Sequence, residues 1–231
     1  MNFKSFLKNH IVVLDGAMGT ELQNAGLALG ELPEEWNISR PDVIEGIHRA
    51  YFAAGADVVY TNTFGANSLK FGERTKEVVA AGVACALRAR GNGKNKFVAL
   101  DVGPTGKLLK PLGDLDFEAA VKIFGATISA GAEAGADLIA IETMNDVYEL
   151  KAAVLAAKEY GHGLPVIATG VFGSDCKMMT GAEPEAVTAL LEGLGADAIG
   201  LNCSLGPKDM LPAAERFLKC ASVPVVVKPN A

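Results

Sequence analysis

The 231-residue sequence lacks the features of several common functional classes. No run approaches the roughly 18 apolar residues of a membrane-spanning helix. Its 21 Lys and Arg residues are dispersed and outnumbered by 27 Asp and Glu, so the formal net charge is -6 and no basic stripe offers phosphates a docking surface. We therefore expect neither a membrane nor a nucleic acid among the partners of this chain.

Cysteine is scarce and irregularly spaced. The four cysteines are Cys85, Cys176, Cys203 and Cys220. Without CxxC spacing, and in a chain this long, they do not indicate a disulfide framework. The apolar run before Asp15 is too short for the core of a signal peptide, and no small-residue cleavage site follows it. These features predict a cytoplasmic protein.

Seven short runs rich in β-branched residues recur along the chain. They are Ile11–Leu14, Val58–Thr61, Phe97–Leu100, Leu138–Ile141, Val166–Thr169, Ala198–Leu201 and Val225–Val227. Their near-continuous apolar character is typical of strands buried on both faces of a parallel sheet. Helical patterns lie between them at Pro41–Ala54, Leu115–Ala134 and Pro184–Leu194. Such helices supply the crossover connections that parallel neighbours need.

The triplet Gly-Ala-Asp occurs three times, each time between a predicted helix and a predicted strand. The copies are Gly55–Asp57, Gly135–Asp137 and Gly195–Asp197. Glycine at this point can adopt the left-handed conformation that ends a helix. We interpret the repeat as a helix–strand connector, so it is evidence for the architecture and not for a site.

Polar residues follow the predicted strands all round the set. They are Asp15, Asn62–Thr63, Asp101, Glu142, Asn202–Cys203 and Lys228–Asn230. A barrel enzyme gathers its site at the carboxyl ends of all its strands, whereas a doubly wound sheet concentrates it at one switch point. The pattern therefore predicts that residues 1–231 form one α/β domain, a TIM (β/α)₈ barrel. The printed chain stops after the seventh strand, so we expect the eighth βα unit to be absent from it.

Six segments at or near these strand ends carry a resemblance. They are LDGAMGTELQ from Leu14, LPEEWNI from Leu32, TNTFGAN from Thr61, DVGPTG from Asp101, IETM from Ile141 and GLNCSLGP from Gly200. In this order, from about Val12 to Ala231, the sequence resembles the homocysteine S-methyltransferase family. The run from Leu32 to Asn67 is more similar to the homocysteine-binding domain at the start of cobalamin-dependent methionine synthases than to the betaine- or S-methylmethionine-using branches.

The resemblance implies an enzyme of methionine biosynthesis that transfers a methyl group to L-homocysteine and gives L-methionine. A thiol of pKa about 8.5 is mostly protonated at neutral pH, and the thiolate is the nucleophile. In this family, zinc held by three cysteine thiolates binds and ionises the substrate sulfur. The resemblance also implies methylcobalamin and 5-methyltetrahydrofolate as the methyl source, acting through cobalamin- and folate-binding domains that are separate from this one.

Cys203 in GLNCSLGP matches the first zinc cysteine of the family. By position alone, the commoner role would be that of a small buried apolar residue, and we keep this interpretation for Cys85 and Cys220. Cys176 matches no family ligand and is left open. The other two family ligands are adjacent cysteines on the eighth strand, so the printed chain holds one ligand of three. We therefore expect this chain alone to be inactive.

The family binds the substrate amino group with two acidic residues, to which Asp15 and Glu142 correspond. Carboxylates fix the direction of an ammonium through charge-assisted hydrogen bonds. The backbone amides of Gly16 and Ala17 are our candidates for the substrate carboxylate, because glycine-containing turns often leave amides free to bind anions. Two alternatives remain: Asp15 as a helix N-cap, and Glu142 as the partner of a neighbouring lysine.

Asn62, Thr63 and Asn202 are candidate supporting donors at the substrate site, although strand-end amides often just satisfy backbone groups. A rival enzyme hypothesis is a barrel lyase or aldolase in which Lys228 forms a Schiff base, a role that needs an amine made neutral by burial. A further alternative is a non-catalytic fragment or subunit that needs a partner chain.

Overall fold

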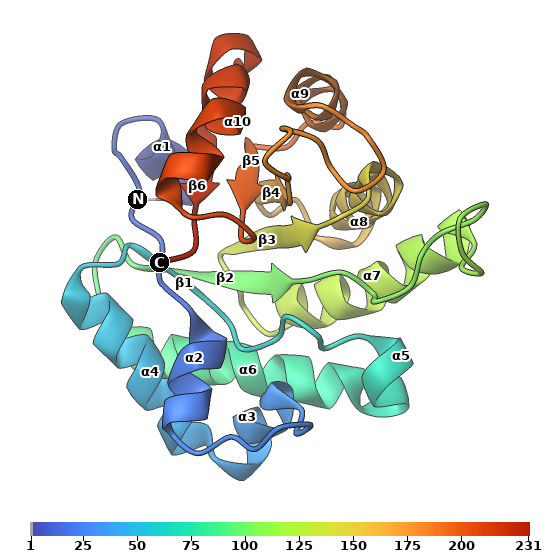
Figure 1. Cartoon of the computed structure of the whole chain (residues 1–231). Coiled ribbons are helices and arrows are strands. Elements are labelled where there is room, and N and C mark those ends of the chain that lie inside the picture. Colours follow the sequence, from blue (N-terminus) through green and yellow to red (C-terminus); the bar gives the residue numbers. More distant parts are fainter. Residues whose placement is uncertain (1) are drawn as a thin grey trace. The chain divides into compact units, whose positions relative to one another are not determined.

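The structure, a computed structural model, describes residues 2–231 (Figure 1). Its strands are β1 Val58–Tyr60, β2 Phe97–Val102, β3 Leu138–Met144, β4 Val166–Gly170, β5 Ala198–Asn202 and β6 Val225–Lys228. They form a sheet in the order β1-β2-β3-β4-β5-β6, and the registers of β1 with β2, β4 with β5 and β5 with β6 are parallel. The order rises without the reversal that marks a doubly wound sheet, so the predicted barrel-type α/β topology is confirmed.

Helices connect the strands. The bounds are α1 Phe3–Leu7, α2 Met18–Asn24, η1 Pro33–Glu35, α3 Trp36–Ser39, α4 Pro41–Ala54, α5 Ser68–Phe71, η2 Gly72–Arg74, α6 Thr75–Arg90, α7 Phe117–Glu133, α8 Val147–Tyr160, α9 Pro184–Gly193 and α10 Pro207–Cys220. The three predicted helices are therefore α4, α7 and α9. Helices α4 and α9 begin at the prolines where they were expected to begin, because proline suits the first helical turn. Within residues 2–231, no helix is long and apolar enough to cross a membrane.

Six of the seven predicted strands are present, and the first is not. The segment Ile11–Leu14 makes one isolated bridge, from Leu14 to Val58, and no ladder. The backbone N–H of Val13 donates to the Asp57 carboxylate at 3.0 Å instead of to a neighbouring strand. Ile11 is 94% exposed and Val13 53% exposed, so the prediction of a strand buried on both faces is wrong here. An apolar run indicated burial, but among residues 2–231 this segment pairs with β1 alone and through a single bridge, so much of it stays exposed.

The chain divides into two compact units, and each has its own packing. Unit 1 comprises the described residues up to Val102 together with residues 126–139. One of its core clusters joins Leu22, Trp36, Ile44 and Cys85, all buried. The guanidinium of Arg40 lies 4.2 Å from the centre of the Trp36 ring, a cation–π contact that covers this cluster. A second cluster packs helix α6 on β1 and β2 through Ala86, Val59 and Val98.

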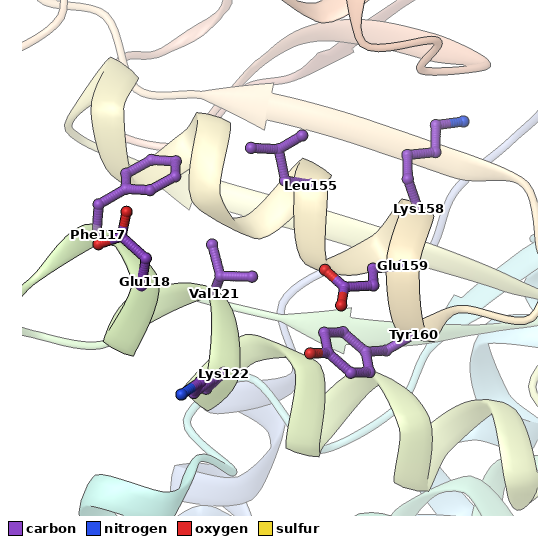
Figure 2. Close-up of a pocket in the computed structure, with 8 residues that line it drawn as sticks. All are labelled: Phe117, Glu118, Val121, Lys122, Leu155, Lys158, Glu159 and Tyr160. Carbon is purple, nitrogen blue, oxygen red and sulfur yellow. The ribbon is translucent and has the colours of Figure 1, made fainter.

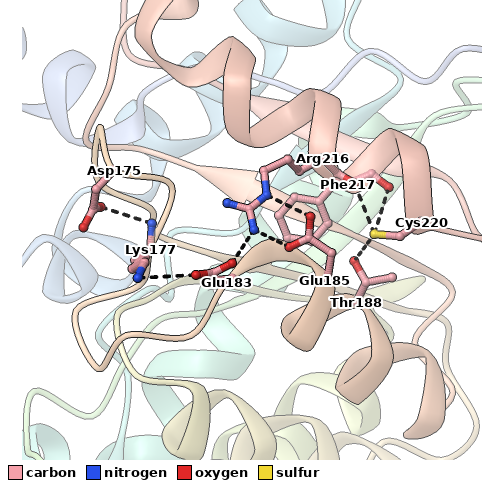
Figure 3. Close-up of polar contacts among 8 residues, drawn as sticks. All are labelled: Asp175, Lys177, Glu183, Glu185, Thr188, Arg216, Phe217 and Cys220. Atoms are coloured by element: carbon pink, nitrogen blue, oxygen red, sulfur yellow. Dashed lines mark hydrogen bonds and ion pairs between the residues drawn. The ribbon is translucent and has the colours of Figure 1, made fainter.

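Unit 2 comprises residues 103–125 and 140–231. Phe217 of α10 is fully buried and meets the ring of Phe172 edge-on, with 5.4 Å between ring centres. Figure 3 shows how α10 is also tied to the α9 region by charge: Arg216 reaches Glu183 and Glu185, each at 2.5 Å. Hydrogen bonds from Arg216 lower the pKa of both carboxyls. Because these groups face water, the pairs orient the helices more than they stabilise them.

The three Gly-Ala-Asp connectors share one geometry. The glycines have positive φ angles, 114° at Gly55, 96° at Gly135 and 77° at Gly195. The carboxylate of each aspartate then accepts a backbone N–H from the preceding segment or strand. Asp57 accepts from Val13 at 3.0 Å, Asp137 from Val98 at 2.8 Å, and Asp197 from Val166 at 2.9 Å. The repeat is therefore a connector, as expected, and its aspartate additionally binds the start of the preceding strand.

Replacement of Asp137 tests this bond. Its carboxylate accepts from Val98 N and also from Arg90 at 2.5 Å, both within unit 1. We expect Asp137→Ala to lower the free energy of unfolding by about 1–2 kcal/mol, because it leaves the Val98 N–H without an acceptor. Asp137→Asn keeps an acceptor oxygen and should lose less. Urea unfolding measures both, with Asp116→Ala, from an exposed ion pair, as the control. An alanine variant as stable as the parent would contradict the assigned role.

His48 of α4 is a buried ionisable group. Its side chain is fully buried, and neither ring nitrogen has a hydrogen-bond partner among the described residues. Burial without a partner disfavours the charged ring and lowers the pKa of His48 to about 4, from an ordinary 6.5. The folded chain therefore binds fewer protons than the unfolded chain at pH values between these two pKa values.

Stability should consequently fall as the pH drops through this window. The contribution of neutral His48 is fully present above about pH 6.5 and is lost progressively toward about pH 4, on the order of 3 kcal/mol in all. We expect His48→Leu to remove this part of the pH dependence, whereas His162→Asn, in an exposed turn, should leave it intact. Urea titrations at pH 7, 6, 5 and 4 give the slope. Equal slopes for His48→Leu and the parent would rule out this role.

Candidate functional site

The turn from Asp15 to Ala17 lies in unit 1, directly before α2. Asp15 is 7% exposed, and its Oδ2 accepts the backbone N–H of Tyr60 at 2.7 Å, so the carboxylate is fixed at the end of β1. The N-cap of α2 is Ala17, not Asp15. The alternative interpretation of Asp15 as the helix N-cap is therefore wrong, and its side chain binds a strand end instead.

Glycine at position 16 leaves room for the Tyr51 side chain beside this turn. A Cβ atom there would lie 2.9 Å from the ring of Tyr51, whose hydroxyl donates to the carbonyl oxygen of Ala17 at 3.2 Å. Ala17 supplies no side-chain cap to α2, so no side chain occupies the first amides of the helix in the usual way. The turn is thus held by Tyr51 while its backbone stays exposed at Gly16 and Ala17.

Asn62 and Thr63 follow β1 and make their hydrogen bonds inside unit 1. The Nδ2 of Asn62 donates to Pro33 O at 2.8 Å and to Asn37 Oδ1 at 3.0 Å, which ties the η1–α3 segment to the strand end. The hydroxyl of Thr63 donates to Asp101 O at 2.7 Å. Both side chains are buried. This geometry favours the alternative in which strand-end polar groups satisfy neighbouring backbone.

Glu142, in β3, lies in unit 2. Its Oε2 is 3.2 Å from the Nζ of Lys228 at the end of β6, and the two side chains are 14% and 22% exposed. The alternative interpretation, a lysine partner for Glu142, is therefore confirmed. Lys228 lies in an ion pair with this carboxylate, whereas a Schiff-base lysine must be a neutral amine. The lyase hypothesis accordingly finds no support in this geometry.

Cys203 begins a tight turn at the end of β5. Its backbone N–H donates to Lys228 O at 3.0 Å, and its carbonyl accepts from Leu205 N at 2.8 Å. Cys203 has a φ of 64° and Ser204 a φ of 61°. Two successive non-glycine residues in the left-handed region are uncommon and cost about 1–3 kcal/mol each, and such strain is often found at functional sites. The thiol is half-buried within this turn.

Asn202 joins three strand ends in unit 2. Its Oδ1 accepts from Thr143 N at 2.9 Å and from the Thr169 hydroxyl at 2.8 Å, and its Nδ2 donates to Thr143 Oγ1 at 2.8 Å. We call Thr143, Thr169 and Asn202 the Asn202 clamp. The sequence indicated Asn202 but not the two threonines, although both are polar residues at the carboxyl end of a predicted strand, which is the signal that could have found them.

The cysteines of this chain do not gather into a metal site. Cys85 is buried in the core of unit 1, and burial raises the pKa of its thiol. Cys220 is exposed on α10, where its thiol donates to Arg216 O at 3.1 Å (Figure 3). Among residues 2–231, no three His, Cys, Asp or Glu side chains are grouped so that they could hold a metal ion.

A cavity of about 560 Å³ lies between α7 and α8, within unit 2 (Figure 2). Phe117, Val121, Leu155 and Tyr160 give it apolar walls, and charged side chains such as Glu118 surround them. None of the site residues expected from the sequence lines it. The candidate residues of each unit consequently lie at strand ends and not in this cavity.

Comparisons with known proteins match this chain to a family. The chain is 36% identical over 244 residues to the methionine synthases of Mycobacterium tuberculosis (strain ATCC 25618 / H37Rv) and Mycobacterium leprae (strain TN), covering 97% of this chain and 20% of each relative. The chain thus spans about a fifth of the length of these curated relatives.

A solved structure gives the same result. The metallated form of the homocysteine methyltransferase MmuM from Escherichia coli superposes with a TM-score of 0.87 at 26% identity, over 98% of this chain and 86% of that one. The family model described as homocysteine S-methyltransferase matches residues 12–231, which include every candidate residue named above. This chain belongs to the homocysteine S-methyltransferase family.

Proposed function

We propose that this chain is the homocysteine-binding part of a methionine synthase, which transfers a methyl group to the sulfur of L-homocysteine and yields L-methionine. In this reaction a bond forms between the substrate sulfur and the methyl carbon, the bond between that carbon and the donor breaks, and the thiol proton is lost. The observation that carries the proposal is the family match over residues 12–231, which includes a buried carboxylate at Asp15 and a mostly buried one at Glu142.

Glu142 is suited to receive the substrate ammonium. Its Oε2 faces Lys228 at 3.2 Å, and a carboxylate has two oxygens with about four acceptor positions, so it can hold a second cation. Asp15 is the second proposed acidic residue, with one oxygen already held by Tyr60 N. The exposed amides of Gly16 and Ala17 are proposed to bind the substrate carboxylate.

Cys203 is proposed as one thiolate ligand of a zinc ion. The metallated form of the E. coli relative supports a metal in this family, and the turn at Cys203 leaves the thiol partly accessible. The described residues provide no grouped ligand set, and the family resemblance implies that the remaining ligands are adjacent cysteines on an eighth strand. We accordingly expect this polypeptide to bind zinc weakly by itself and to be inactive without those ligands.

The methyl source is proposed to lie on other domains. Methionine synthase relatives are about five times as long as this chain, which leaves room for separate cobalamin- and folate-binding domains as its partners. Methylcobalamin is the proposed donor. A protein that contains these domains should form labelled methionine from homocysteine and labelled methylcobalamin. Formation of methionine from S-methylmethionine or betaine alone would reassign the donor.

Charge removal at the two carboxylates tests amino-group recognition. We expect Asp15→Asn and Glu142→Gln each to weaken homocysteine binding by about 1–3 kcal/mol, since each removes a charge-assisted hydrogen bond. Calorimetric titration measures the affinity, and 3-mercaptopropionate, which lacks the amine, is the control ligand. If both ligands lose affinity equally in these variants, the carboxylates do not recognise the amine.

Substitution of the thiol tests the metal role. In a protein that includes the eighth βα unit, Cys203→Ser should lower zinc affinity by at least about tenfold, because a neutral alcohol is a poor replacement for a thiolate ligand. Equilibrium dialysis with zinc gives the affinity, and Cys220→Ser, at an exposed helix position, is the matched control. Equal zinc binding by the parent and the Cys203→Ser chain would remove Cys203 from the ligand set.

A further inference from the structure

The direction of the Asn202 amide is fixed by its neighbours. A backbone N–H can only donate, so the amide atom 2.9 Å from Thr143 N must be the oxygen. The Nδ2 then faces Thr143 Oγ1 at 2.8 Å, and the Thr169 hydroxyl donates to the same oxygen at 2.8 Å. Asn202 is 4% exposed and Thr169 2% exposed, so water competes little for these bonds.

The clamp acts on a residue with an unusual backbone. Thr143 has a φ of 60°, and a β-branched residue is a clear outlier in this region. One amide group binds both its N–H and its hydroxyl, so the two hydrogen bonds together define the left-handed conformation. The strained residue is therefore held by Asn202, and Asn202 in turn is held by Thr169.

The clamp is continuous with both unit 2 residues that the proposed function uses. Glu142 directly precedes Thr143, and Cys203 directly follows Asn202. Movement of Thr143 would turn the backbone at Glu142 and redirect its carboxylate. Movement of Asn202 would turn the backbone at Cys203 and redirect its thiol. Asn202 also pairs in register with Lys228, the cation that faces Glu142, so all these groups meet at the ends of β3, β5 and β6.

We propose that Thr143 and Thr169 are positioning residues that act through Asn202 to fix the directions of Glu142 and Cys203. The assignment of these two groups to an amino-thiol substrate rests on the proposed function. Neither threonine needs to touch the substrate in this role. The clamp fixes the backbone at the ends of β3 and β5. These two strands are not neighbours in the sheet, because β4 lies between them.

Alkylation of Cys203 tests the clamp without any substrate. Thr143→Val and Thr169→Val each keep the shape of the side chain and remove its hydroxyl. We expect iodoacetamide to modify Cys203 about fivefold faster in either variant, the scale for losing one hydrogen bond that restrains the turn. Peptide mass spectrometry resolves each cysteine, and the exposed Cys220 is the internal reference whose rate should not change.

Matched variants separate positioning from general loosening. Thr188→Val removes a buried hydroxyl from α9, also in unit 2, and should leave the absolute Cys203 rate unchanged; Cys220 is not its reference, because the Cys220 thiol donates to Thr188 Oγ1 at 3.4 Å. Thr143→Ser and Thr169→Ser retain the hydroxyl and should restore the slow rate. The proposal is overturned if the valine variants stay within twofold of the parent, if Thr188→Val accelerates Cys203 equally, or if serine does not restore the parent rate. Thr169→Val alone decides the matter if Thr143→Val does not fold.

Ligand binding provides the second readout. The valine variants should weaken homocysteine several-fold more than 3-mercaptopropionate, because a misdirected Glu142 affects only the ligand that has an amine. Equal weakening of the two ligands would contradict the link from the clamp to Glu142. If a protein that supplies the remaining zinc ligands binds no homocysteine, the proposed function is wrong, whereas the alkylation rates still decide whether Thr143 and Thr169 fix the turn at Cys203.

Discussion

Every strand of a parallel sheet ends with backbone groups that the sheet itself does not pair, and this structure depends on how side chains pair them. An unpaired buried N–H costs about as much as a lost hydrogen bond. At the amino ends, the aspartates of the Gly-Ala-Asp connectors accept the N–H groups of Val13, Val98 and Val166. At the carboxyl ends, Asp15 accepts from Tyr60 and Asn202 accepts from Thr143.

The same requirement explains which parts of the fold could be predicted from the sequence. Strands such as Leu138–Ile141 are apolar on both faces, and the left-handed glycine after each predicted helix end has a local cause, so both can be recognised without the structure. Ile11–Leu14 has the same apolar character but makes a single bridge. Its fate depended on pairing with a distant segment, because Leu14 meets only Val58 of β1. A local pattern does not contain that information.

The candidate site was predictable to a similar degree. The motifs identified Asp15, Glu142 and Cys203, and the sequence also suggested that a lysine could pair with Glu142, which Lys228 does. Thr143 and Thr169 were not identified, because a threonine at a strand end is common and its partner, Asn202, is 59 positions from the one and 33 from the other. The positive φ at Thr143 distinguishes it, and backbone angles at single residues are not encoded in residue type outside glycine and a few polar residues.

The pairing of Glu142 with Lys228 has a consequence for how a cationic ligand can be received. A carboxylate that is largely shielded from water is costly unless a cation or several donors accompany it. The Glu142 side chain is only 14% exposed, so its carboxylate needs a cation beside it before any substrate arrives. Lys228 fills that place at 3.2 Å, and under the proposed function the free acceptor positions of the carboxylate receive the ammonium as a second cation. The ion pair is thus compatible with the proposed amino-group recognition, and the proposed role of the Asn202 clamp is to keep the direction of Glu142 fixed beside Lys228.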